Sequence, residues 1–185
     1  MKKTLMVAGV LLALAGCGKE QSETLSPYEA ADMQATSYNF QLFPGAQYLA
    51  PQTELFRRAH FVMQPKAKTA PPMAMYDTDA SLEDVAKFYG GKYGYTIAEN
   101  ETNNFSSVKP QAYYTQGDLA ADTMQVKPIL EQLKVQADLT KASGTWRGVH
   151  ISPKTDYPRV TLQRPYFDFT KSQTVDKTLV LMVKE

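Results

Sequence analysis

The sequence predicts an α+β domain in which an antiparallel or mixed sheet carries about two helices packed on one face. Three observations lead to this fold class. An amphipathic helix is predicted after Ser81, short apolar runs typical of strands lie on both sides of it, and the C-terminal segment has the pattern of a β-hairpin. Helices combined with strands that follow one another directly are typical of the α+β class.

The N-terminal part of the domain is predicted to contain two strands. Residues 54–63 mix apolar and charged side chains, which we interpret as a strand. Residues 65–72 begin and end with proline and are expected to form a loop. Residues 73–76 are expected to form a second, short strand.

The clearest helix follows Ser81. The stretch from Ser81 to Asp84 resembles a capping box with Asp in place of the usual Glu. One apolar stripe with helical spacing then consists of Leu82, Val85, Phe88 and Tyr89. The helix is expected to stop at the glycines Gly90, Gly91 and Gly94, and residues 95–98 to form the next strand.

A second helix is predicted after a long polar loop at residues 99–118. Asp118 is a candidate helix cap, and the apolar spacing continues to about Lys134. Pro128 favours a helix that starts near that position, because proline suits the first turn. Residues 135–140 alternate like a strand, and the choice between helix and strand is left open for them.

The C-terminal part is predicted to be all strand. A strand at 148–152 precedes a closing hairpin formed by 159–170 and 178–184. Phe167 and Phe169 have the opposite parity to Val160 and Leu162, so a bulge near Pro165 is expected to bring them into one core. Residues 179–183 are apolar on both faces, as in a covered central strand.

The N-terminus predicts where the protein is located. Lys2 and Lys3 precede an apolar run that is too short to span a bilayer. The following Leu14-Ala15-Gly16-Cys17 resembles the lipobox of bacterial lipoproteins. The resemblance implies that the Cys17 thiol receives a diacylglycerol and that the chain is cut before Cys17. Because no Asp follows Cys17, the resemblance implies a lipid anchor in the outer membrane rather than in the inner membrane, with the protein facing the periplasm.

Composition limits the remainder of the chain. Residues 18–37 are polar and are expected to act as a tether, and 38–185 as one globular domain. Without Lys2 and Lys3, 18 basic and 19 acidic side chains remain, a formal charge of −1. That balance argues against nucleic-acid binding. No other apolar run is long enough to span a membrane, and with Cys17 lipidated no cysteine remains for a disulfide.

The sequence contains no recognisable catalytic or cofactor motif. His60 and His150 lie far apart in predicted strands and are interpreted as structural. Asp77 and Asp79 could act as an acid/base pair, but acidic residues are also favoured just before a helix. We therefore expect no metal, no cofactor and no enzymatic activity.

Two groups of residues are candidate binding sites. Tyr113, Tyr114 and Trp146 could stack on sugar rings. Near Pro165, a surface for a protein partner is predicted from Arg159, Arg164 and Tyr166. The leading prediction is a non-catalytic interaction or assembly partner of another envelope protein. The alternative is a module that binds glycan, cell wall or a small ligand, and a hydrolase is the least favoured function.

Overall fold

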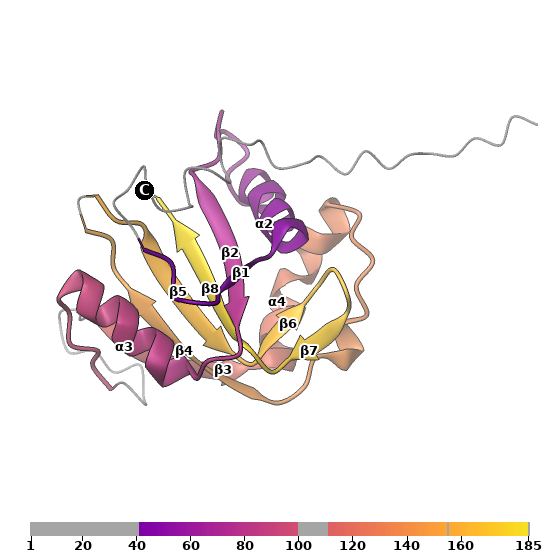
Figure 1. Ribbon diagram of the computed structural model, residues 1–185. Helices are drawn as coiled ribbons and strands as arrows, with labels where there is room; N and C mark the ends of the chain where they lie inside the picture. The colour runs from indigo at the N-terminus through magenta and orange to yellow at the C-terminus, as the bar shows by residue number, and fades with distance from the viewer. Residues whose placement is uncertain (1–40, 100–110, 155, 185) are drawn as a thin grey trace, which may run out of the picture.

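A six-stranded antiparallel sheet forms the centre of the protein (Figure 1). The computed structural model describes residues 41–99, 111–154 and 156–184. Across the sheet the strand order is β1 (Gln47–Tyr48), β2 (Met73–Thr78), β8 (Thr178–Val183), β5 (Arg159–Arg164), β4 (Thr145–Ile151) and β3 (Ala112–Asp118). A second, two-stranded sheet consists of β6 (Tyr166–Asp168) and β7 (Gln173–Val175). The predicted α+β class is confirmed.

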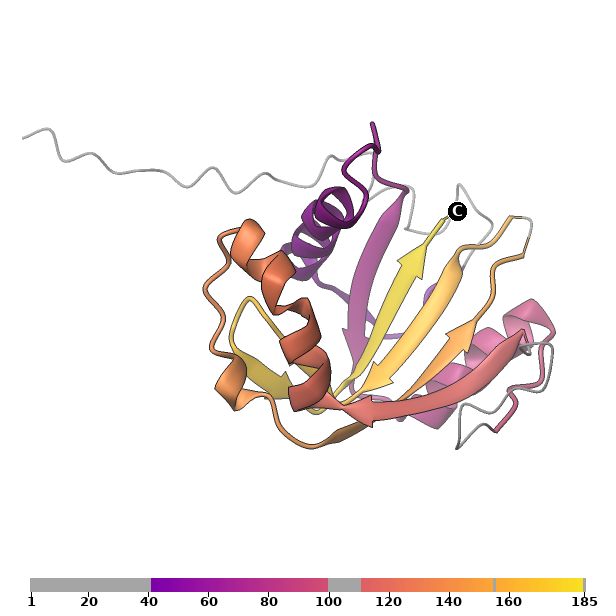
Figure 2. The ribbon, with the colours of Figure 1, turned by 180° about the vertical axis from the view of Figure 1, so that it is seen from behind.

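In the residues that the structure describes, three α-helices pack on both faces of the large sheet, and not on one face only. They are α2 (Ala50–Met63), α3 (Leu82–Tyr93) and α4 (Leu119–Gln132), and a single 3₁₀ turn, η1 (Leu139–Lys141), follows α4. In Figure 1, α3 crosses in front of the strands; in Figure 2, seen from behind, α3 lies behind them and α4 stands beside them on the left. Both views place α2, α4 and the β6–β7 sheet together at one side of the molecule. None of the helices in the described ranges is long and apolar enough to cross a membrane.

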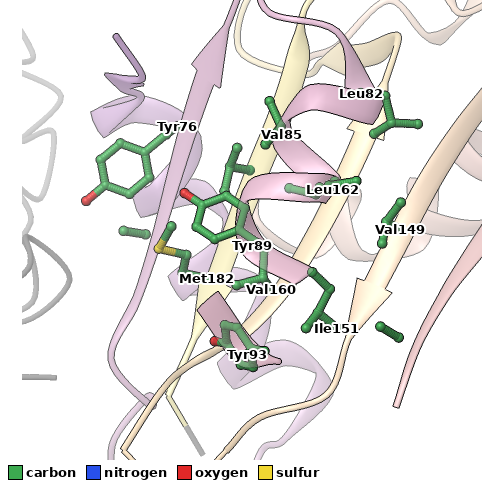
Figure 3. Close-up of a cluster of buried hydrophobic side chains, with 14 residues drawn as sticks. Tyr76, Leu82, Val85, Tyr89, Tyr93, Val149, Ile151, Val160, Leu162 and Met182 are labelled. Carbon is green, nitrogen blue, oxygen red and sulfur yellow. The ribbon is translucent and has the colours of Figure 1, made fainter. Parts of the chain in front are cut away.

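The main core lies between α3 and the sheet (Figure 3). Val85 and Tyr89 of α3 and Val160 and Leu162 of β5 all have no measurable exposure. The phenolic oxygen of Tyr89 also accepts a hydrogen bond from the backbone N–H of Phe43, at 3.1 Å. This face is therefore closed and densely packed, as expected for a protein interior.

The helix predicted after Ser81 is confirmed. The Ser81 hydroxyl oxygen accepts a hydrogen bond from the Asp84 backbone N–H at 3.1 Å and donates one to the Asp84 carboxylate at 2.7 Å. The helix continues through the first two glycines and ends at Gly94, whose φ of +66° lies in the left-handed region that glycine adopts most easily.

The prediction of a strand at 54–63 is wrong, because these residues belong to α2. The helix has Pro51 in its first turn, a position that suits proline. Its apolar side chains recur at three- and four-residue steps from Leu55 to Met63, so their period is that of a helix. The neighbouring charges of Arg57 and Arg58 conceal that period in a short window.

Two predictions around the polar loop need correction. Residues 95–98 make only one bridge, between Ala98 and Tyr113, instead of a strand. The C-terminal end of the predicted loop at 99–118 is strand β3, whose run of Ala, Tyr, Tyr and Thr favours a strand. Residues 100–110 lie outside the described residues.

The second predicted helix is confirmed from its cap onward. Asp118 caps α4 by accepting a hydrogen bond from the Ala121 backbone N–H at 2.8 Å. Pro128, however, lies inside α4 and does not start a helix. The segment left open at 135–140 contains no strand, and its last residues belong to η1.

The closing hairpin is confirmed as the antiparallel pair of β5 and β8, and β8 lies between β2 and β5 as a central strand. At Pro165, which follows a cis peptide bond, the chain leaves the large sheet instead of forming a bulge within it. Phe167 is buried as expected, but it packs with Leu119 and Ala142 in a separate cluster. The prediction of one core shared with Val160 and Leu162 is therefore wrong.

Candidate functional site

The three aromatic side chains proposed for sugar stacking do not form one platform. Tyr113 and Tyr114 are adjacent on β3 and point to opposite faces of the sheet. The Arg147 guanidinium lies over the Tyr114 ring, with its central carbon 4.1 Å from the centroid of that ring. The Trp146 ring lies close over Gly117, where an added Cβ would come within 2.6 Å of it, and its indole N–H donates to the Asp122 carboxylate. The ring of Tyr113 packs beside that of His150, with 5.4 Å between the ring centroids, so all three rings make contacts within the fold.

The surface predicted near Pro165 is also largely used by the fold. Tyr166 is only 4% exposed, so the prediction that it faces outward is wrong. Its hydroxyl donates to the buried carboxylate of Asp77 at 3.0 Å. Burial, together with this hydrogen bond and the negative charge of Asp77, raises the pKa of the Tyr166 phenol above its usual range. Arg159 is exposed on β5, and its role in an interface stays a prediction.

Arg164 joins three segments of the chain. Its guanidinium donates to the backbone carbonyl oxygens of Asp79 and Ala80, at 3.1 and 2.9 Å. It also donates to the carboxylate and the backbone carbonyl of Asp176, at 2.9 and 3.1 Å. Its side chain is 26% exposed. The arginine therefore links the turn before α3 to the turn between β7 and β8.

We expect the substitution Arg164→Ala to lower the free energy of unfolding by about 2 kcal/mol, because it removes several charge-assisted hydrogen bonds. Chemical denaturation of the full chain measures this change. Arg159→Ala, on the exposed part of the same strand, serves as the matched control and should change stability by less than about 0.5 kcal/mol. Equal effects of the two substitutions would show that Arg164 does not hold the turns together.

Among the described residues, the two histidines and the aspartates considered from the sequence each make contacts of their own within the fold. His60 packs against the ring of Phe61 in α2, and His150 lies 3.2 Å from the Thr161 hydroxyl. Asp77 bonds to Tyr166 as described, and Asp79 pairs with Lys177 at 3.3 Å. Within the part of the chain that the structure describes, no group of three His, Cys, Asp or Glu side chains could hold a metal ion.

A groove of about 330 Å³ opens between α2, α4 and the sheet face opposite α3. Its walls are two stripes with helical spacing. The stripe on α2 consists of Gln52, Leu55, Phe56, Ala59 and Met63, and the stripe on α4 of Leu119, Asp122, Thr123, Val126, Ile129 and Leu130. Each stripe extends over twelve residues, which are separated by eleven helical rises of about 1.5 Å, so the groove is roughly 16 Å long.

The sheet forms the floor of the groove and β6 closes one end. Met75 of β2 and Leu181 of β8 belong to inner strands, yet both are only half-buried because the helices above them stand apart. Phe167 and Phe169 lie at the closed end, beside the buried first turns of both helices. At the other end, Met63 is 49% exposed. The two faces of the sheet therefore differ sharply, one being closed by α3 and the other open.

Polar groups in the groove are few and mostly paired. The amide nitrogen of Gln52 donates to the Asp168 carboxylate at 2.8 Å and to the Thr170 hydroxyl at 3.2 Å. Its amide oxygen is buried and has no hydrogen-bond partner among the described residues. The hydroxyl of Thr123 donates to a backbone carbonyl, and Gln163 donates to the carbonyl of Pro165 at 3.3 Å. The groove thus offers apolar contact and little hydrogen bonding.

A second hollow of about 650 Å³ lies on the outer side of α4, beside Met124 and η1. It is more open and more polar than the groove, and several of its lining side chains are charged. Shallow polar hollows are common on protein surfaces, whereas ligand sites are concave and mostly apolar. The groove is therefore the better candidate site.

Sequence reasoning missed the groove because it assigned residues 54–63 to a strand. The signal was present, since Gln52, Leu55, Phe56, Ala59 and Met63 have the three- and four-residue spacing of one helix face. A window that began at Pro51 would have shown it.

The chain was compared with protein-family models, curated proteins and solved structures, and none of the three comparisons finds a match.

Proposed function

We propose that the protein is a non-catalytic binding protein of the bacterial envelope, which holds an apolar ligand in the groove between α2 and α4. The observation that carries the proposal is the open, apolar face of the sheet, where Met75 and Leu181 stay half-buried on inner strands. Apolar surface that stays accessible to water gives up a stabilisation of roughly 25 cal/mol per Å². A ligand that fills the groove would bury this surface and recover that free energy.

The size and lining of the groove support a small ligand. Its volume of about 330 Å³ lies at the lower end of the range of small-molecule sites, roughly 300–1,000 Å³. Of the sequence-based alternatives, the groove favours ligand binding over assembly with another protein. Two of the residues predicted for a protein interface, Arg164 and Tyr166, make their polar contacts within the fold instead.

The resemblance of residues 14–17 to a lipobox supports a location at a membrane. A lipid anchor on Cys17 would hold the domain beside the outer membrane, facing the periplasm. Membranes are the main source of long apolar molecules in a bacterial envelope. The anchor and the groove therefore fit one activity, in which the domain takes up an apolar molecule close to the bilayer.

Photolabelling tests the proposal on the full chain in membranes. A sixteen-carbon alcohol that carries a diazirine is added, and labelled peptides are identified by mass spectrometry. We expect the label on α2, α4 and β8. Ala59→Trp fills the groove and should lower labelling at least about tenfold. Ala121→Trp makes the same change on the exposed surface of α4 and should leave labelling intact. Labelling unaffected by Ala59→Trp would refute the proposal.

A further inference from the structure

We propose that the ligand is the acyl chain of an anionic amphiphile, bound with its tail toward β6 and its charged head at the Met63 end of the groove. This inference rests on the proposed function and names the chemistry of the ligand. Two independent features carry it: the scarcity of free hydrogen-bonding groups along the groove, and the contrast between the end that β6 closes and the open, basic end.

The lining argues against a peptide. An extended peptide in the groove would bury its backbone N–H and C=O groups, each of which needs a partner when it leaves water. The polar side chains of Thr123, Gln163 and Tyr166 already bond to the protein itself. The unpaired amide oxygen of Gln52 could satisfy a single N–H, which is far fewer than the backbone groups of an extended peptide. An acyl chain has no polar groups along its length, so it is removed from water without that penalty.

The size of the groove argues against a peptide helix. A helix with its side chains is about 10 Å across, so a segment 16 Å long occupies roughly 1,300 Å³. The groove is too small to enclose such a segment, which could lay at most one face in it. A single acyl chain is much thinner and fits lengthwise between the two stripes.

The two ends of the groove differ in their access to water. At the closed end, β6 covers the groove. The buried carboxylates near that end are already paired, since Asp77 lies 3.9 Å from Lys177 and Asp168 lies 3.7 Å from Lys171. A charged headgroup buried there would lose its hydration without gaining a free partner, so a fatty acid or anionic lipid enters the groove with its tail inward.

The open end is basic. Arg58 on α2 is exposed and reaches across to α4, where it donates to the backbone carbonyl of Leu133 at 3.1 Å. Lys66 and Lys68 follow Met63 on the exposed turn after α2, and no acidic side chain pairs with either of them within the described ranges. These three cations fit a carboxylate or phosphate at the mouth of the groove.

The positive charge at the mouth of the groove also favours a free anionic amphiphile over the lipid on Cys17 as the ligand. A diacylglycerol attached through sulfur has no charged headgroup, so the three cations would contribute nothing to its binding. The structure therefore favours an anionic amphiphile from the surrounding membrane as the occupant.

The test compares two photoprobes with the same sixteen-carbon tail, a carboxylate and an alcohol, on the full chain in membranes. We expect the carboxylate to label the groove about threefold to tenfold more efficiently, as two or three exposed charge contacts provide, and raised salt to reduce the preference. Lys66→Glu combined with Lys68→Glu should abolish the preference while labelling by the alcohol persists. Lys87→Glu combined with Lys92→Glu, on α3, is the matched control and should retain it.

Each outcome decides between the two proposals. If alcohol and carboxylate label the groove equally, the groove binds apolar chains but the assignment of an anionic amphiphile is wrong. If neither probe labels it, both proposals fail. If Cys17→Ser raises labelling several-fold, the protein's own lipid occupies the groove and the assignment to a free amphiphile is overturned.

Discussion

Replacing Leu162 by Ala is expected to lower the free energy of unfolding by about 3–4 kcal/mol, and replacing Leu181 by Ala by only about 1 kcal/mol. The two leucines lie on adjacent central strands, β5 and β8, and point to opposite faces of the sheet. Leu162 has no exposure and packs beneath α3, so its loss creates a closed cavity. Leu181 borders the groove and is half-buried, so its loss only widens an existing space.

Chemical denaturation of the two variants measures this difference directly. The comparison is matched, because both substitutions remove the same atoms from inner strands of one sheet. Equal losses of about 3–4 kcal/mol would contradict the open groove, since they would show that α2 and α4 close over Leu181 as α3 does over Leu162.

Replacing Cys17 by Ser is expected to abolish lipidation and to leave the unprocessed precursor. The thiol is the group that would receive the diacylglycerol, and several acyl chains anchor a protein far more firmly than one. Metabolic labelling with radioactive palmitate and the intact mass of the product measure the effect. Maturation of the Cys17→Ser chain to a soluble periplasmic form would contradict the lipoprotein assignment.

The parts of the fold that follow from local chemistry could be predicted from the sequence. Ser81 and Asp118 cap their helices through their own side chains, and Gly94 ends α3 in the left-handed region. The apolar run of β8 predicted a covered central strand; β8 does lie between β2 and β5, but its Leu181 face borders the groove. These signals arise from contacts between residues close in the sequence, so they do not depend on how the rest of the chain folds.

Features that depend on tertiary context could not be predicted. Pro128 lies inside α4, although the intrinsic preference of proline favours a helix start. The opposite parities of Leu162 and Phe167 indicated a break at Pro165, but only the structure shows that the chain leaves the sheet there. Helix α2 was hidden by charged residues within its apolar period.

The candidate site depended on these same long-range features. The groove joins α2, α4, β6 and the inner strands, which are far apart in the sequence. The residues proposed from the sequence alone, Arg164, Tyr166 and Trp146, make their polar contacts within the fold. Exposed position and residue type suggested binding, but the structure shows these side chains holding strands and turns together.

The most direct test of the groove is a methyl NMR titration of the full chain with labelled methionines, in which decanoate serves as the ligand. Met63 and Met75 line the groove, Met182 lies in the core beneath α3, and Met124 lies on the outer side of α4. Binding in the groove predicts that the Met63 and Met75 signals shift together with one affinity, while those of Met182 and Met124 stay in place. Unchanged Met63 and Met75 signals at saturating decanoate, or equal shifts at Met124, would contradict a binding site between α2 and α4.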